Sequence, residues 1–209
     1  MLRDMVTKIP GARKVAQTLG LAPINSDYRR FLLEMLPKNS VGAEIGVHTG
    51  SFSQRLLMVV NPKELHLIDP WKHESSTTYK KAWYGGMVKN GQKEMDERYA
   101  DVCARFAKEI RAERVKIHRG YSTDILAQFP DEYFDWVYID GNHLYDYVKS
   151  DIELSFRKTK VGGYITGDDY TDGGWWEGGV KKAVDEYAKT VSAQSVDIRN
   201  RQFIFHKQS

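Results

Sequence analysis

Residues 134–170 read FDWVYIDGNHLYDYVKSDIELSFRKTKVGGYITGDDY, and their pattern indicates the fold class. Two short runs, at 136–139 and 164–166, are rich in aromatic and β-branched side chains, and acidic residues follow both. Between them, apolar side chains recur at the three- and four-residue spacing of one helix face: Tyr145, Val148, Ile152 and Phe156. This order predicts a strand, a helix and a parallel strand, with both strands ending at the same edge of a sheet. In open α/β sheets, ligands bind at that edge.

Four polar residues follow these two strands, and we expect them to converge at that edge: Asp140, His143, Asp168 and Asp169. Crowded carboxylates repel one another, and a bound divalent metal would relieve the repulsion. Their oxygen atoms suit Mg²⁺, with Mn²⁺ or Ca²⁺ as substitutes. A histidine, with a reference pKa of about 6.5, is suited to accept a proton at neutral pH. The pattern therefore predicts an enzyme with a metal and proton-transfer site.

Each of these residues also has a plainer interpretation. Asp140 is also placed to contact a cofactor instead of a metal. The pair Asp168 and Asp169 is also typical of a turn in which one acid caps the following segment. His143 is also suited to lie at the start of a helix or to bind the metal itself. The sequence leaves these alternatives open.

Strand and helix patterns alternate from about residue 41 to the end of the chain. This alternation predicts an α/β fold with one seven-stranded, mostly parallel sheet and helices on both faces. We expect strands at 41–47, 64–69, 115–119, 134–140, 161–167, 194–198 and 202–206. We expect helices at 51–60, 94–112, 122–128, 144–158 and 178–191. The last two strands are so close that they should form a hairpin, which adds an antiparallel strand to the sheet.

Two kinds of segment interrupt this alternation. Residues 1–38 should form a helical N-terminal extension that includes an amphipathic helix at 27–36. We expect 39–209 to be one domain with a lid-like insertion at about 71–93, where aromatic residues, glycines and lysines follow no clear period. A second loop, TDGGWWEGG at 171–179, also follows a strand. Both loops should lie over the ligand edge, where they would act as lids or substrate walls.

The first predicted strand ends in the turn EIGVHTGS, which carries the spacing Glu-x-Gly-x-x-x-Gly at Glu44, Gly46 and Gly50. Glycine lets the backbone turn tightly and lets a ligand approach it closely. Ser51 and Gln54 have the spacing of a capping box, so the next helix should begin there. Because many α/β turns contain glycines, this turn alone is also consistent with a purely structural role.

Asp69, at the end of the second predicted strand, shifts the balance toward a ligand. Nucleotide-binding α/β folds use an acid at this position to bond the two ribose hydroxyls. Trp71 is placed either to stack on an adenine ring or to pack beneath the insertion. Ser122, after the third strand, should cap the next helix and border an adenine pocket. We therefore expect the cofactor to contact Glu44, Gly46, Gly50, Ser51, Asp69, Trp71, Ser122 and Asp140.

Together these residues resemble the motifs of the class I S-adenosylmethionine-dependent methyltransferases. The glycine turn is similar to the first motif of that family, and Asp69 to its ribose-binding acid. The segments FDWVYIDGNH and KVGGYITGDDY are similar to its fourth- and fifth-strand motifs. The resemblance covers roughly residues 40–207 and implies a Rossmann-like fold with S-adenosylmethionine as the cofactor.

A narrower resemblance rests on IDGNH-x-Y and GDDY, which are similar to segments of the metal-dependent O-methyltransferases related to macrocin O-methyltransferase. That resemblance implies that Asp140, Asp168 and Asp169 bind Mg²⁺ and that His143 is the base. It also favours a hydroxyl of a sugar or a natural-product glycoside as the methyl acceptor, with a phenolic diol second.

Composition sets further bounds. The 209 residues suit one domain, and 41% hydrophobic with 28% charged residues is ordinary for a globular protein. There is no apolar run near the ~20 residues that span a bilayer, and charges interrupt the N-terminus where a signal peptide is apolar. The single cysteine fits a reducing cytoplasm. A net charge of +3 with interleaved acids and bases matches no nucleic-acid-binding pattern. We expect a cytoplasmic protein whose partner is a small molecule, not a membrane or a nucleic acid.

Two other functions compete with this expectation. A nicotinamide oxidoreductase on a similar fold needs the spacing G-x-G-x-x-G, which Gly46-x-x-x-Gly50 does not supply. A non-catalytic protein that binds a cofactor or a glycan would need no base. The N-terminal helix outside the core is in addition a reasonable contact for a homodimer.

Overall fold

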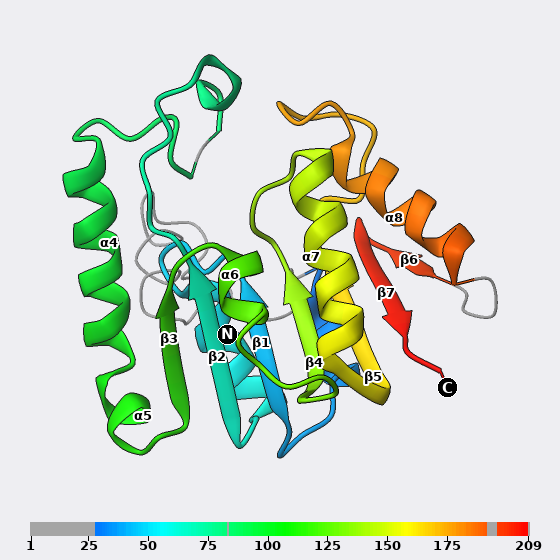
Figure 1. Ribbon diagram of the computed structural model, residues 1–209. Coiled ribbons are helices and arrows are strands. Elements are labelled where there is room, and N and C mark those ends of the chain that lie inside the picture. Colours follow the sequence, from blue (N-terminus) through cyan, green and yellow to red (C-terminus); the bar gives the residue numbers. More distant parts are fainter. Residues whose placement is uncertain (1–27, 83, 192–195, 209) are drawn as a thin grey trace, which may run out of the picture.

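The computed structural model describes residues 28–82, 84–191 and 196–208. In this part of the chain, one sheet has the strand order β3-β2-β1-β4-β5-β7-β6 (Figure 1). Its strands are β1 (Val41–Ile45), β2 (Glu64–Asp69), β3 (Val115–Arg119), β4 (Phe134–Ile139), β5 (Thr159–Gly167), β6 (Asp197–Arg199) and β7 (Gln202–His206). Strands β1 to β5 pair in parallel, and β7 is antiparallel to both β5 and β6. The predicted α/β fold is confirmed, including the C-terminal hairpin.

Each predicted helix that falls on described residues is present. The helices are α2 (Arg30–Met35), α3 (Ser51–Arg55), α4 (Gln92–Arg105), α5 (Ala107–Arg111), α6 (Ser122–Leu126), α7 (Tyr145–Lys158) and α8 (Gly179–Thr190). Two differ from the expectation: the helix at 51–60 continues from α3 as a π-helical turn, η3 (Leu56–Val60), and the helix at 94–112 breaks at Phe106 into α4 and α5. Residues 1–27 of the expected N-terminal extension, and the start of the strand expected at 194–198, lie outside the described residues.

Helices cover both faces of the sheet, as the side chains of β4 illustrate. Val137 and Ile139 belong to one buried cluster, whereas Trp136 and Tyr138 belong to another, because alternate strand side chains point to opposite faces. Helices α6, α7 and α8 pack on the first cluster with Leu126, Val148, Ile152, Phe156, Val180 and Val184. Elements α2, η3 and α4 pack on the second with Leu32, Leu33, Leu56, Val60, Met95 and Val102. The described part of the N-terminal extension is thus built into the core.

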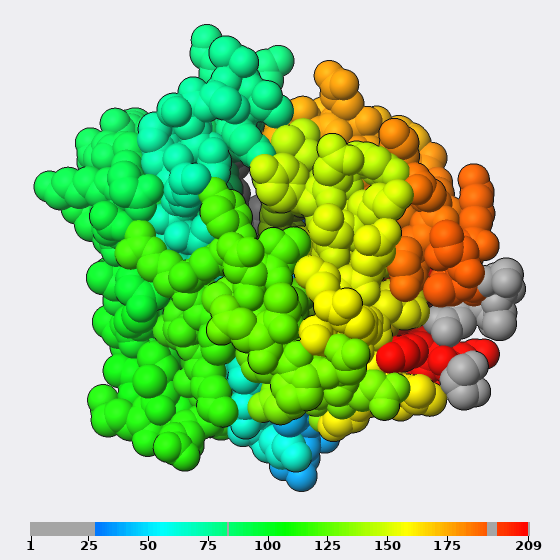
Figure 2. Space-filling model, viewed as in Figure 1, coloured from blue at the N-terminus to red at the C-terminus, as the bar shows by residue number. Residues whose placement is uncertain are grey.

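Two irregular segments stand above the carboxyl ends of the parallel strands (Figure 1). One joins β2 to α4 and contains the 3₁₀ turn η4 (Thr77–Tyr79); the other joins β5 to α8. Figure 2 shows the surface hollowed between the first of these segments and the residues that follow β4. Both predicted loops therefore lie over the expected ligand edge. Within the described residues, the structure contains no helix with the length and apolarity to cross a membrane.

Candidate active site

The register of β4 and β5 brings the expected polar residues to one edge. Ile139 pairs with Gly167, so the chain leaves both strands side by side. The Asp140 N–H donates to the Ile45 carbonyl oxygen at 2.7 Å, and the Asp168 N–H donates to the Ile139 carbonyl oxygen at 3.1 Å. These bonds continue the parallel pairing by one residue and fix the positions of both acids.

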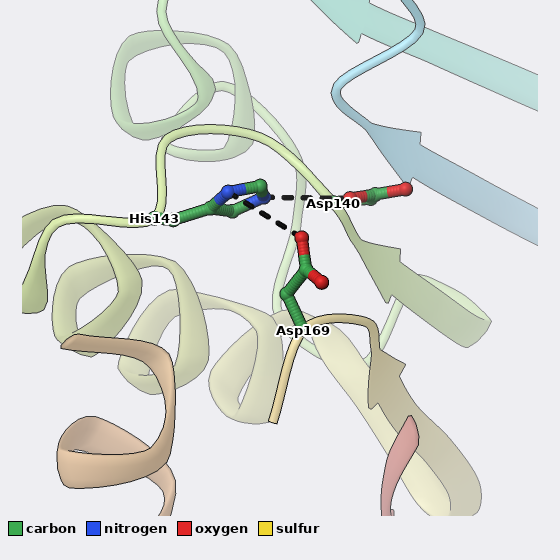
Figure 3. A group of neighbouring side chains, drawn as sticks. All are labelled: Asp140, His143 and Asp169. Atoms are coloured by element: carbon green, nitrogen blue, oxygen red, sulfur yellow. Dashed lines mark ion pairs between the residues drawn. The ribbon is translucent and has the colours of Figure 1, made fainter. Parts of the chain in front are cut away.

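His143 lies beside two carboxylates, those of Asp140 and Asp169 (Figure 3). Its Nε2 is 3.4 Å from Asp140 Oδ1, and its Nδ1 is 3.6 Å from Asp169 Oδ2. Neither ring nitrogen has a hydrogen-bond partner among the described residues. Burial lowers the pKa of His143, but Asp140, Asp169 and Asp168 raise it, so the net shift is upward. Both ring nitrogens are buried and unsatisfied at the ligand edge, an arrangement suited to a group that exchanges a proton with a ligand.

The loop that carries His143 is held from two sides. Asn142 Oδ1 accepts the Leu144 N–H at 3.0 Å, and Asn142 Nδ2 donates to the Tyr79 hydroxyl at 2.7 Å. Helix α8 begins directly against this loop, because a Cβ on Gly179 would lie only 2.6 Å from the His143 carbonyl oxygen. Glycine is therefore required at 179 for close packing, and the loop 171–179 also has this structural role.

Aromatic side chains from both overhanging segments surround His143. The Trp176 ring meets the imidazole edge to face with centroids 4.8 Å apart, and the Trp175 centroid lies 6.2 Å away. Tyr79, from the segment between β2 and α4, contacts Trp175 at 5.4 Å between centroids. These rings supply an apolar wall beside the imidazole, as expected for an acceptor pocket.

Arg29 is a site residue that the sequence analysis missed. Its Nη1 donates to Asp140 Oδ2 at 3.0 Å and to the Tyr138 hydroxyl at 3.0 Å. Its Nη2 lies 2.6 Å from Asp168 Oδ2, which also accepts the Tyr28 hydroxyl at 2.8 Å. Burial lowers the pKa of Arg29, but Tyr138 and the two carboxylates outweigh it, so the guanidinium stays charged. One cation therefore bridges two of the three carboxylates.

The other oxygens of the acid pair are also occupied. Asp168 Oδ1 accepts the backbone N–H of Asp169 at 2.7 Å and a short hydrogen bond from Gln202. Asp169 Oδ1 accepts a short hydrogen bond from Arg201, which leaves Oδ2 toward His143. Among the described residues, one group of three side chains could hold a metal ion: Asp140, His143 and Asp169. One possible ligand atom from each of them lies within 4.8 Å of the other two.

These contacts correct one premise of the metal prediction. The expectation was that Asp140, Asp168 and Asp169 would need a metal to relieve their repulsion. Instead, Arg29 and Arg201 pair with them directly. Asp168 is 4% exposed and contacts Arg29 and Tyr28, and the group of possible ligands found among the described residues does not include it. The predicted carboxylates converge, but not as one open set of ligands.

Asp69 lies at the end of β2 and is buried. Its Oδ2 accepts the backbone N–H groups of Val47 and His48 at 2.9 Å each, which ties β2 to the turn after β1. Its Oδ1 accepts the Trp71 N–H at 2.7 Å and a short hydrogen bond from the Tyr84 hydroxyl. Asp69 is thus an acceptor that already binds a hydroxyl at the position expected for a ribose.

The glycine turn between β1 and α3 is sterically required. Gly46 has φ +89°, and a Cβ there would lie 2.0 Å from the Asp140 carbonyl oxygen. Gly50 has φ +74° and is the residue before α3. The capping-box prediction was wrong: α3 begins at Ser51 after a left-handed Gly50, with no side-chain cap, and the Ser51 hydroxyl lies 3.2 Å from that of Thr49.

Glu44 lies in β1 and is 1% exposed, so it faces the protein interior in this structure. Its Oε2 accepts the Ser53 hydroxyl at 2.5 Å. Burial raises the pKa of Glu44 to about 8, even though the bond from Ser53 lowers it. Glu44 therefore supports the turn from beneath, through Ser53.

The raised pKa of Glu44 predicts that stability falls with rising pH. The unfolded chain releases the Glu44 proton at a pKa of about 4.5, whereas the folded protein keeps it to about 8, so stability is lost between these values. The variant Glu44→Gln keeps an acceptor for Ser53 without ionising. We expect it to be more stable than the wild type by on the order of 3 kcal/mol above about pH 8 and nearly equal below about pH 5. Urea unfolding of both proteins above about pH 8 and below about pH 5 measures the difference in their free energies of unfolding. If Glu44→Gln is less stable than the wild type by the same amount at both pH values, the prediction is wrong.

Two residues that we expected at the cofactor, Trp71 and Ser122, make structural contacts within the protein. Trp71 is fully buried, its indole N–H donates to the His48 carbonyl oxygen at 2.8 Å, and its ring packs on Tyr99. The packing alternative for Trp71 is therefore the one its contacts support. Ser122 does not cap α6: Tyr121 precedes the helix without a side-chain cap, and the Ser122 hydroxyl donates to Asp151 at 2.5 Å.

Two features define the class of this protein. The strand order has an antiparallel seventh strand inserted beside β5, and the ligand edge carries an acid after β2 and a histidine–carboxylate group after β4 and β5. They define a Rossmann-like α/β protein of the methyltransferase fold. Residues 43–170, more than half of the chain, match the family described as "Methyltransferase domain". The chain belongs to this methyltransferase family.

Solved structures share this fold at low sequence identity. A protein from Corynebacterium glutamicum is 15% identical with a TM-score of 0.62, over 94% of this chain and 88% of that one. The O-methyltransferase NovP is 20% identical with a TM-score of 0.57, over 89% and 78%. TomG, an O-methyltransferase from Streptomyces achromogenes involved in tomaymycin synthesis and solved in complex with S-adenosylmethionine, is 16% identical with a TM-score of 0.53, over 82% and 74%. No curated protein matches the sequence significantly.

Proposed function

We propose that this protein is a cytoplasmic S-adenosylmethionine-dependent O-methyltransferase that methylates a hydroxyl of a small molecule. A sugar or natural-product glycoside is the first candidate for the acceptor, and a phenolic diol is the second. The observation that carries the proposal is His143, whose two ring nitrogens have no hydrogen-bond partner among the described residues and lie near Asp140 and Asp169 at the ligand edge. The family match and the two O-methyltransferase structures support it.

The residues at the ends of β1 and β2 fit S-adenosylmethionine. Asp69 Oδ1 accepts a hydrogen bond from the Tyr84 hydroxyl, and this contact supports a role for the same oxygen in accepting a ribose hydroxyl once Tyr84 moves away. Gly46 and Gly50 form the turn against which the rest of the cofactor would lie. When bound, S-adenosylmethionine supplies a methyl group on a sulfonium, which is a good leaving group.

The role of His143 follows from the chemistry of a hydroxyl acceptor. As the acceptor oxygen forms its bond to the methyl carbon, its proton must leave, and the neutral imidazole of His143 accepts it. The carboxylates of Asp140 and Asp169, which lie 3.4 Å and 3.6 Å from the ring nitrogens, stabilise the imidazolium that results. Trp175, Trp176 and Tyr79 exclude water and orient the acceptor.

The expected metal does not fit this arrangement. The guanidinium of Arg29 lies between Asp140 and Asp168, where a metal shared by these carboxylates would be. The remaining set, Asp140, His143 and Asp169, includes the base, and a metal held there would take the lone pair that accepts the proton. We therefore assign no step to a metal, and assistance by Mg²⁺ stays a prediction from the resemblance.

The raised pKa of His143 predicts the pH dependence of the reaction. Because the base must be neutral, kcat/KM should rise with pH along a limb whose midpoint lies above the ordinary histidine value of about 6.5. In Asp169→Asn, one carboxylate that raises the pKa is gone, so the midpoint should move to lower pH by on the order of one unit. Initial rates across the pH range, at subsaturating acceptor, check this. An unmoved limb would mean that another group titrates.

The proposal is tested by supplying S-adenosylmethionine labelled in its methyl group together with sugars, glycosides and phenolic diols. A labelled product that carries a new methyl ether on one acceptor class supports it. Labelled methyl groups on nitrogen, on carbon or on a macromolecule would overturn the hydroxyl assignment while keeping the family.

A further inference from the structure

We propose that Arg29 is the resident cation of this site, and that its guanidinium and a divalent metal exclude each other from the space between Asp140 and Asp168. Two different nitrogens of the guanidinium contact the two carboxylates, Nη1 at 3.0 Å from Asp140 Oδ2 and Nη2 at 2.6 Å from Asp168 Oδ2. A metal shared by the same two oxygens would have to occupy the volume that the guanidinium fills.

Arg29 is held firmly in this position. Its guanidinium carbon lies 4.8 Å from the centre of the Phe52 ring, a cation–π contact. The Tyr28 hydroxyl accepts hydrogen bonds from Nε at 3.0 Å and from Nη2 at 2.9 Å. The Arg29 side chain is 19% exposed, and a buried guanidinium paired with two carboxylates is strongly favoured over an unpaired one. Arg29 is therefore a built part of the site rather than a surface side chain that reaches in.

Asp168 contacts two consecutive residues of one turn, Tyr28 and Arg29. Its Oδ2 accepts the Tyr28 hydroxyl at 2.8 Å and pairs with Arg29. Tyr28 and Arg29 immediately precede α2, whose Leu32 and Leu33 are buried in the core. Metal binding at Asp168 would therefore require this single turn to lift away while α2 stays anchored.

The two cations differ in what they leave for catalysis. With Arg29 in place, Asp140 Oδ1 and Asp169 Oδ2 remain directed at His143. If a metal bound while Arg29 stayed in place, its possible ligands among the described residues would be Asp140, His143 and Asp169. Arg29 is thus a positioning residue: it pairs with the carboxylates of Asp140 and Asp168, fixes their orientation, and leaves the imidazole available.

The test measures Mn²⁺ binding by calorimetry to the whole protein, without cofactor or acceptor. The variant Arg29→Met removes the charge but keeps most of the side-chain volume, and it should bind Mn²⁺ about tenfold tighter than the wild type or more, because a nearby positive charge is gone. Arg29→Lys keeps the charge without the bidentate geometry and should bind with intermediate affinity. The matched control is Arg30→Met, since Arg30 is the neighbouring arginine, is exposed and forms an ion pair with Glu34 on the same helix; its affinity should equal that of the wild type.

Two results would overturn the inference: wild-type protein that binds Mn²⁺ as tightly as Arg29→Met, or a folded Arg29→Met that binds it no tighter than the wild type. If Arg29→Met does not fold, Arg29→Lys provides the test. Tighter Mn²⁺ binding to Arg29→Lys than to the wild type supports the inference, and unchanged binding contradicts it. A gain in Arg29→Met that disappears when Asp168→Asn is added locates the metal between the two carboxylates. Because no methyl transfer is measured, failure here leaves the proposed function intact, and failure of the proposed function leaves this result intact.

Discussion

Replacing His143 with alanine should lower kcat for methyl transfer by about 100- to 10,000-fold while leaving the affinity for S-adenosylhomocysteine unchanged. The imidazole is the neutral base in the proposed reaction, and its two nitrogens have no hydrogen-bond partner within the described structure. The Asp69 and glycine-turn residues that would hold the cofactor belong to β1 and β2 and do not depend on the His143 side chain. Steady-state rates and calorimetry on the same preparation separate the two effects.

A second histidine provides the control for this experiment. His206 is exposed at the end of β7, where its Nε2 lies 3.2 Å from the Gly162 carbonyl oxygen, and His206→Ala should keep wild-type turnover. Full activity in a folded His143→Ala protein would remove the base assignment. Loss of both turnover and cofactor binding would instead show that the loop after β4 is needed to form the cofactor site.

Replacing Asp69 with asparagine should weaken S-adenosylhomocysteine binding by about 100-fold. The amide can keep the oxygen that accepts the Val47 and His48 N–H groups, so the turn after β1 is preserved. The other atom becomes an NH₂ group, which cannot accept a ribose hydroxyl, and the charge that strengthens such hydrogen bonds is lost. Calorimetric titration of each protein with S-adenosylhomocysteine measures the difference, and circular dichroism establishes that the variant is folded.

Tyr84→Phe is the matched control, because it removes the same Tyr84–Asp69 hydrogen bond from the other end. If Asp69 binds the ribose, Tyr84 competes with the cofactor for Oδ1, and its loss should leave affinity equal or slightly higher. If Tyr84→Phe weakens binding as much as Asp69→Asn does, then the bond between them shapes the pocket and Asp69 is not the ribose acceptor.

The core of the fold could be predicted from sequence because its signals are local. Alternating side chains in β4 and the three- and four-residue spacing in α7 each lie within one short segment, and the hairpin of β6 and β7 follows from their closeness in the chain. The rule that parallel strands end at one edge then places Asp140, His143 and Asp169 together. That part of the candidate site required no knowledge of distant contacts.

Arg29 could not be found in this way, because it is 111 residues from Asp140 in the chain and belongs to no periodic pattern. The sequence contains only an indirect indication of Arg29. Three acids predicted at one place need a neighbouring positive charge, and a basic side chain of this chain can supply that charge as well as a metal can. Arg201 supplies part of that charge in the same way, from the hairpin turn between β6 and β7.

The errors at Ser51 and Ser122 have a different cause. Both serines stand where a capping side chain is common, but each lies one residue inside its helix, after Gly50 and Tyr121 respectively. The Ser122 hydroxyl instead satisfies the buried carboxyl of Asp151, a long-range demand that helix-start patterns do not include. Trp71, for which the sequence left two alternatives open, is fully buried, and its contacts favour the packing alternative.

The most direct measurement is a calorimetric titration of S-adenosylhomocysteine into the wild-type protein. We expect one site with a dissociation constant of about micromolar order, since Asp69 and the glycine turn are already arranged at the ends of β1 and β2. If a protein shown to be folded does not bind S-adenosylhomocysteine, it is not a methyltransferase that uses S-adenosylmethionine, and His143 and its carboxylates form a site for some other chemistry.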